Sequence, residues 1–388
     1  MKLTLAWHNL LHSKLRTAVA LAGVTFAVVL IFMQLGFLGA VESTATLIYD
    51  ALEFDLLVRS RQYLHVSDAR SFPRKRLYQA ASVAGVQSVS PFYIELNQWR
   101  NPQSFELRGI LTMGVEPDQS IFRVPEISAQ QRSLTTPEQL LIDRKTRPEF
   151  GPRDRQFGDG DLQVETEIGR QKVRIAGHFE LGTGLAANGA VLLNHHGFAR
   201  ISPGRTEDDV SLGLVCVDHP HDPGTLADTA QRLRTAMGAA SDVEILTREE
   251  ALAEERYFWL RDKSIGIMFQ IGVVVAFIVG TAIVYQVLSA DVANHLGEYA
   301  TLKAMGYGKG DLSFIILAQA LAMSVLGFIP GWLLAWGLYW FTSQMAGVSI
   351  SMRVAYFAIV LISSTLMCSL SGWGALRKVH HADPADLF

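Results

Sequence analysis

The sequence has few cysteines and little net charge. It therefore offers no basis for a disulfide framework or for binding nucleic acid through its overall charge. Its 388 residues include two cysteines, Cys216 in a polar region and Cys368 in a long apolar run. These two positions give no plausible pair, so a disulfide framework is excluded. The formal net charge of −3 gives no bulk electrostatic basis for binding nucleic acid.

Several catalytic motifs are also missing. No G-x-x-x-x-G-K-[ST] sequence occurs, which excludes ATP hydrolysis by a P-loop within this sequence, and neither H-E-x-x-H nor G-x-S-x-G is found. His195 and His196 are adjacent, and His219 and His221 flank a proline, but neither pair has a cysteine or carboxylate nearby at ligand spacing. We interpret all four as loop histidines and expect neither a metal site nor a cofactor in this chain.

The sequence is instead rich in long apolar runs. Hydrophobic residues make up 49% of it and charged residues 18%, a blend typical of a few membrane-spanning helices with a substantial soluble domain. Four runs are long enough to span a bilayer: 18–41, 265–289, 313–341 and 354–376. None contains a carboxylate that could relay protons, which argues against a secondary transporter, and they offer no polar lining for a channel.

The two ends of the sequence indicate its orientation. Residues 1–17 have an apolar stripe that includes Trp7, with cations on the remaining faces, which predicts an interfacial helix contacting membrane lipids. The alternative, the start of a signal peptide, is disfavoured because the following apolar run is too long. Basic residues in 1–17 and in the tail 377–388 predict that both termini are cytoplasmic. Residues 45–262 then lie outside the membrane, and 291–311 lie on the cytoplasmic side.

Residues 45–262 are predicted to form an α+β domain of two lobes. A split lobe of β-α-β type combines strands and helices from both ends of this region, at 54–60, 74–85, 86–99, 209–218, 222–238 and 243–247. An insertion at about 105–205 is expected to form a second, mostly β lobe. A capping box at Thr247–Glu250 is expected to open a helix that runs on into the second span. The predicted fold class is therefore a membrane protein with four transmembrane α-helices and a large extracytoplasmic α+β domain.

The third and fourth spans carry small residues at helical spacing, which permit close approach of helix backbones. Packing within one chain and a seam between two copies are both open interpretations of these stripes. The residues are Gly327, Gly331 and Ala335 in the third span, and Ser364, Cys368 and Gly372 in the fourth.

Residues 291–311 form a polar segment between the second and third spans. Asp291, Glu298 and Lys303 cannot sit in lipid, since a charged side chain at mid-bilayer costs roughly 2.5–3.5 kcal/mol even on insertion scales. The segment is therefore predicted to form a short water-side hairpin, with a small helix over 296–306.

Within this segment the sequence LGEYATLKAMG resembles the signature E-i-g-x-l-[KR]-A-x-G of permeases of the MacB/FtsX superfamily of ABC systems, in a form similar to the DevC branch of cyanobacteria. Three other stretches agree with the family pattern, at 7–28 (WHNLLHSKLRTAVALAGVTFAV), at 160–179 (Gly160-Asp161, then VETEIGRQKVRIAGHF) and at 382–388 (ADPADLF). The resemblance extends over the whole chain in order, except that no ATPase domain is fused to it.

The resemblance implies a non-catalytic permease subunit in the inner membrane that works as a homodimer. ATP and Mg would be bound by a separate ABC ATPase subunit, and a periplasmic adaptor and a TolC-like outer-membrane channel would complete an exporter of a glycolipid or other envelope component. Residues 291–311 would be the coupling helix that grips the ATPase and transmits its motion. In that role Glu298 and Lys303 would make charged contacts with the ATPase, and Leu302 would pack its apolar side chain against it. Gly306 would allow the chain to turn back tightly after the helix. The full coupling set is Leu296, Gly297, Glu298, Tyr299, Leu302, Lys303 and Gly306.

Two other functions remain open within the same superfamily. One is an FtsX-like regulator whose external domain activates an envelope hydrolase without transport. The other is a permease that extracts lipoproteins. A stand-alone enzyme is disfavoured by the missing site chemistry.

Overall fold

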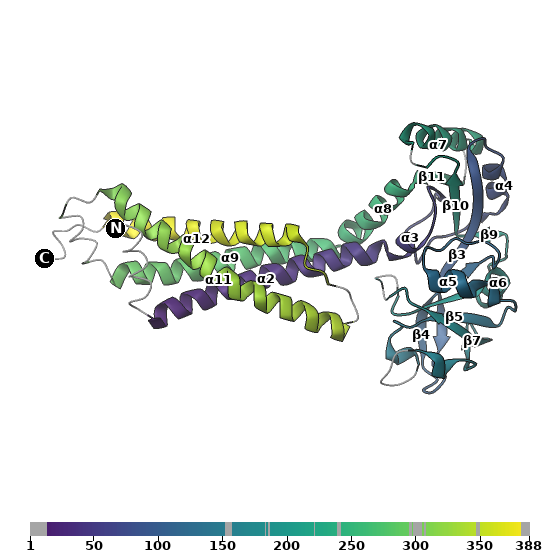
Figure 1. Cartoon of the computed structure of the whole chain (residues 1–388), viewed down its shortest axis with the longest axis horizontal. Coiled ribbons are helices and arrows are strands. Elements are labelled where there is room, and N and C mark those ends of the chain that lie inside the picture. Colours follow the sequence, from purple (N-terminus) through teal and green to yellow (C-terminus); the bar gives the residue numbers. More distant parts are fainter. Residues whose placement is uncertain are drawn as a thin grey trace. The chain divides into compact units, whose positions relative to one another are not determined.

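A computed structural model of the chain (Figure 1) describes residues 14–151, 157–182, 184, 187–220, 222–238, 242–294, 297, 305, 308–346 and 350–381. The chain divides into two compact units. The first comprises Met1–Ala40 and Ile265–Phe388, and the second is Val41–Ser264. We refer to them as the helical unit and the α/β domain.

The helical unit is built on four helices that are long and apolar enough to cross a membrane, among the residues described. They are α2 (Lys14–Ala45), α9 (Ile265–Asn294), α11 (Lys309–Ala346) and α12 (Val354–His381). A helix satisfies all its backbone hydrogen bonds internally, which is why an apolar run of this length folds as one in lipid. Both α9 and α11 pack along α12. The predicted fold class, four membrane helices with a large α/β domain, is confirmed.

One half of the α/β domain is an antiparallel sheet in the order β11-β1-β10-β3. These strands are β11 (Val243–Thr247), β1 (Leu56–Ser60), β10 (Leu212–Val217) and β3 (Val86–Arg100). Helices α4 (Lys75–Ala81) and α7 (Pro223–Met237) bury apolar residues against one face, and a second cluster covers the other, so all five residues of β1 are buried. Segments from both ends of the domain thus share one sheet, as the sequence predicted.

The other half of the domain is a closed ring of strands. From β3 it runs through β4 (Leu107–Val115), β8 (Ala190–Asn194), β5 (Gln139–Asp143), β7 (Gln171–Phe179) and β6 (Glu165–Ile168). The ring closes because β6 pairs back onto β3, with Trp99 opposite Ile168. Its interior is filled by apolar side chains around the fully buried Trp99. The insertion expected at 105–205 is therefore continuous with the other half through β3, which is one long strand.

The remaining elements are short. They are α3 (Leu47–Ala51), β2 (Phe72–Pro73), α5 (Pro125–Gln130), η1 (Gln131–Ser133), η2 (Pro148–Phe150), η3 (Asp159–Asp161), α6 (His195–Ile201), β9 (Asp209–Val210), α8 (Arg248–Tyr257) and η4 (Phe258–Asp262).

The prediction that one unbroken helix runs from Thr247 into the second span is wrong in one respect. The predicted capping box is present, with the Thr247 side chain accepting from the Glu250 backbone N–H, and α8 follows it. However, η4 is a π-helical turn, and the chain leaves the helix at Ser264, whose φ is 58°. The Ser264 N–H donates to the Arg261 carbonyl at 3.0 Å, which closes a tight turn. An uninterrupted hydropathy pattern does not reveal such a change in backbone conformation.

Candidate functional site

The predicted coupling residues lie almost entirely outside the described part of the chain. Leu296, Glu298, Tyr299, Leu302, Lys303 and Gly306 are not described, and Gly297 is a single described helical residue. The flanking helices are described: α9 ends at Asn294 and α11 begins at Lys309. The predicted interfacial helix falls outside the described residues up to position 13, as does the tail from position 382 onward. The coupling role of this segment stays a prediction.

The small residues of the third span lie against the first span of the same chain. A Cβ placed on Gly327 would come 2.6 Å from the Val24 side chain, and one on Gly331 would come 2.6 Å from Val28. The Thr25 hydroxyl donates to the Gly327 carbonyl at 3.1 Å. Helices α2 and α11 therefore approach closely at these two glycines, where any larger residue would have to displace Val24 or Val28.

The other small residues of the third and fourth spans also make contacts within the chain. Ala335 and Cys368 are fully buried. The Ser364 hydroxyl lies 3.0 Å from that of Ser324, and a Cβ on Gly372 would lie 3.2 Å from the Cβ of Ala320. The described surroundings of both stripes are thus the other helices of the same unit.

A second set of contacts ties together the two segments by which the chain enters and leaves the α/β domain. From α8, Arg248 donates to the carbonyl of Tyr49 and to that of Leu52, each at 2.9 Å. Its guanidinium also lies 4.7 Å from the centre of the Phe54 ring. The backbone carbonyls at the end of a helix need a hydrogen-bond donor from water or from a capping side chain. Arg248 supplies these donors to the end of α3 and so links α3 to α8.

Glu255 of α8 adds a buried acid to this connection. Its carboxylate accepts from the Tyr63 hydroxyl at 2.5 Å, from the Val66 N–H at 3.1 Å and from the Trp259 indole at 3.0 Å. The Tyr63 hydroxyl in turn lies 2.7 Å from that of Tyr49. Burial raises the pKa of Glu255, and burial likewise raises the pKa of Tyr63. The acid is therefore held by hydrogen bonds in a site that disfavours its charge.

Arg59 of β1 links the same region to the sheet. Its guanidinium donates to Glu244 of β11 at 2.6 Å, pairs with Glu254 of α8, and lies 4.3 Å from the centre of the Tyr63 ring. We call Tyr49, Arg59, Tyr63, Arg248 and Glu255 the junction clamp. Sequence reasoning missed it, because these residues are far apart in the chain and only the fold brings them together.

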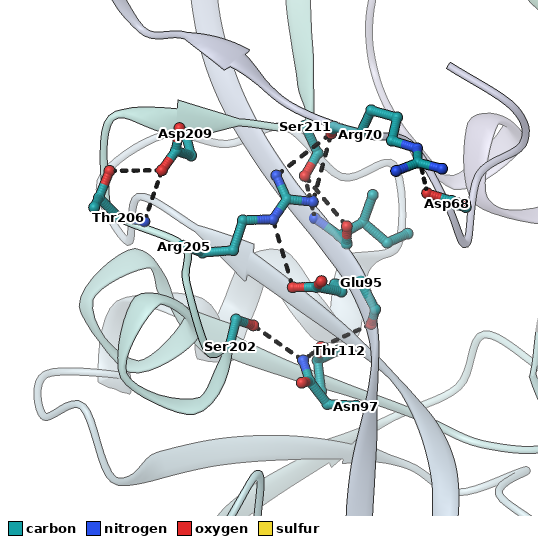
Figure 2. A network of polar contacts seen from close by, with 11 residues as sticks. Asp68, Arg70, Glu95, Asn97, Thr112, Ser202, Arg205, Thr206, Asp209 and Ser211 are labelled. Carbon is teal, nitrogen blue, oxygen red and sulfur yellow. Dashed lines mark hydrogen bonds and ion pairs between the residues drawn. The ribbon is translucent and has the colours of Figure 1, made fainter. Parts of the chain in front are cut away.

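A separate polar network lies where β3 passes from the open sheet into the ring (Figure 2). The Asn97 amide donates to the Thr112 hydroxyl at 2.8 Å and to that of Ser202 at 3.0 Å, and the Ser211 hydroxyl lies 3.2 Å from the Ile94 carbonyl. These bonds satisfy buried polar groups and hold the 202–211 loop against the strand.

One cluster among the described residues has a composition that could hold a metal ion. It consists of His195, His196 and Glu207, each of which offers one ligand atom, and these atoms lie within 4.8 Å of one another. The two histidines were predicted to be loop residues without carboxylate partners. The structure instead places them at the first turn of α6, with the His196 Nδ1 2.5 Å from the Glu207 carboxylate.

Comparison with known proteins gives a match to one family model in the C-terminal part. Residues 271–384 match the model described as FtsX-like permease C-terminal, a range that includes most of α9, the 291–311 segment, and α11 and α12. No curated protein matches the chain. Several solved structures are similar to part of it, and two of them are described here. The extracellular domain of the noncanonic ABC-type transporter YknZ from Gram-positive bacteria is 16% identical, with a TM-score of 0.33, over 50% of this chain and 99% of that one. The periplasmic region of MacB from Actinobacillus actinomycetemcomitans is 9% identical, with a TM-score of 0.35, over 52% of this chain and 92% of that one.

The contact between α2 and α11 yields a first prediction. Replacing Gly331 with leucine should destabilise the detergent-solubilised protein by about 1–3 kcal/mol, because the new side chain must displace Val28. Gly337→Leu in the same helix is the matched control, since a Cβ there meets nothing within 4 Å. Thermal unfolding of both variants measures the difference, and equal stabilities would refute the close approach of α11 to Val28.

The buried acid yields a second prediction. Because burial raises the pKa of Glu255, the folded chain holds this proton to a higher pH than the unfolded chain. The stability that it contributes is fully present below the ordinary pKa of glutamate and is lost as pH rises through the raised folded-state pKa. Melting temperatures measured across this pH range should fall with rising pH in the wild type and fall less in Glu255→Gln. The exposed Glu249→Gln on the same helix should follow the wild type, and identical pH profiles for all three proteins would contradict the account.

Proposed function

We propose that this chain is the permease subunit of an ATP-driven ABC exporter of the MacB/FtsX superfamily, of DevC-like type, which acts by transmitting motion across the membrane. The match of residues 271–384 to the FtsX-like permease model carries the proposal. The four apolar helices, with the large domain inserted between the first and second, support it.

In this proposal a homodimer spans the inner membrane with both termini in the cytoplasm, in accord with the basic residues near each end. The 291–311 segment is the coupling helix, which contacts a separate ATPase subunit that binds and hydrolyses ATP. The α/β domain lies in the periplasm and engages an adaptor and an outer-membrane channel. The exported substrate is a glycolipid or another envelope component.

The junction clamp supports a mechanical role for the α/β domain. The chain passes between the two units at only two points, 40/41 and 264/265. Within the α/β domain, Arg248 and Glu255 of α8 are hydrogen-bonded to α3 and to the chain near it. A force applied at either end of the domain is therefore shared between both ends, and the sheet can move as one body.

The coupling role is tested by charge reversal. Wild-type protein extracted from its native membrane should co-purify with an ABC ATPase and a periplasmic adaptor. Glu298→Lys should lose the ATPase and keep the adaptor, because the substituted charge lies on the cytoplasmic side alone. Asp118→Lys, an equal charge change at an exposed site of the α/β domain, should keep the ATPase.

Other results would change the assignment. Recovery of an ATPase and a cell-wall hydrolase without an adaptor would replace export with the regulatory function. Acylated protein bound to the chain would indicate lipoprotein extraction. Failure of the wild type to recover any ATPase would refute the ABC assignment itself.

A further inference from the structure

Three side chains with metal-binding chemistry converge at one edge of the α/β domain, away from the junction clamp. The rings of His195 and His196 lie 3.9 Å apart between centroids, and the His196 Nδ1 is 2.5 Å from the Glu207 carboxylate. The ligand atoms of all three lie within 4.8 Å of one another. Imidazole nitrogen with carboxylate oxygen is a common donor set for zinc and related divalent metals.

Both segments that carry these residues are held in place. On the histidine side, Asn194 caps α6 by accepting from the Gly197 N–H at 2.7 Å, and its amide donates to the Leu134 carbonyl at 2.9 Å. The cluster therefore begins directly after a fixed helix cap, at the end of the buried strand β8.

On the carboxylate side, the loop around Glu207 is bound at several points (Figure 2). Arg205 reaches Glu95 of β3 at 3.5 Å, and the Thr206 hydroxyl donates to Asp209 at 2.8 Å. The Tyr93 hydroxyl donates to the backbone carbonyl of Glu207 itself at 2.7 Å. The three ligands are thus positioned before any ion binds, which lowers the entropic cost of binding.

The electrostatic surroundings suit a cation. The His195 Nδ1 is buried and has no hydrogen-bond partner among the described residues. The nearby positive charge of Arg74 is paired with Glu116.

We infer that His195, His196 and Glu207 form a binding site for one divalent transition-metal ion, of which Zn²⁺ is the best match. A tetrahedral zinc ion with bonds of about 2.0–2.1 Å requires ligand atoms about 3.3 Å apart. Small side-chain rotations would achieve this spacing: the His196–Glu207 contact opens by less than about 1 Å, and the wider separations close. Water completes the fourth position, and the metal replaces the proton between the His196 Nδ1 and the Glu207 carboxylate, which is released to solvent.

Such an ion would join α6 to the 202–209 loop and so reinforce the link that the Asn97–Ser202 bond makes at the crossing of β3. The inference does not depend on the proposed transport function. It revises the expectation that these histidines are unpartnered, because their carboxylate partner lies 11 positions further along the chain, in a different element.

The test uses the full-length chain in detergent without a histidine tag, stripped of metal and titrated with Zn²⁺ in competition with a chromophoric chelator. The wild type should bind one tight equivalent and gain thermal stability from it. Glu207→Gln and His195→Ala should each bind at least about tenfold more weakly, since even the loss of an outer-shell partner costs about 10–100-fold. His219→Ala, at an exposed histidine outside the cluster, should bind like the wild type.

Co²⁺ provides a readout that does not depend on the stability of the variants. Wild-type protein with one equivalent of Co²⁺ should show the strong visible absorption of a four-coordinate site, and this absorption should vanish on addition of Zn²⁺. A wild type that binds no tight equivalent would show that the cluster is only a histidine–carboxylate ion pair and would overturn the inference. Retention of wild-type affinity by both ligand variants would overturn it as well.

Discussion

The α/β domain depends on the polar contacts that hold its two chain ends together. Arg248 donates to two carbonyls at the end of α3, and Glu255 accepts from Tyr63, Val66 and Trp259 within the same region. A buried carboxyl with this many donors is costly to disrupt, because removing it leaves several polar groups unsatisfied. The two ends of the domain are therefore kept in a fixed relation by polar bonds that have a defined geometry, which apolar packing alone would not impose.

The helical unit meets a different constraint. Between apolar helices in lipid there is little hydrophobic driving force, so close packing and a few hydrogen bonds must supply the stability. Gly327 and Gly331 bring α11 against α2, and the Ser371 hydroxyl donates to the Thr281 carbonyl across α12 and α9 at 2.8 Å. Gln34 lies against Gly272, so this polar side chain of the first span contacts a neighbouring helix.

Sequence reasoning succeeded where a pattern is local. Hydropathy located all four long helices, the strands predicted at 54–60 and 243–247 correspond to β1 and β11, and the capping box located the start of α8. It could not predict the closure of the ring, because the pairing of Trp99 with Ile168 joins residues far apart in the chain. It also missed the turn at Ser264, where the helical pattern continues although the backbone does not. No local sequence pattern predicts the junction clamp or the contact between Glu207 and His196. Both arise only from the tertiary fold.

The central proposal, that the clamp passes ATP-driven motion into the α/β domain, is tested most directly by a distance measured across the proposed assembly of this chain with its ATPase. A spin label at Tyr78→Cys, an exposed position on α4, reports the separation between the two copies of the proposed homodimer, with Cys216 replaced by serine and the buried Cys368 retained. With the ATPase bound, the change from ADP to ATP should shift this distance. Arg248→Ala should reduce the shift while ATP hydrolysis continues. A distance that does not respond to nucleotide, or one that responds equally in both proteins, would contradict the account.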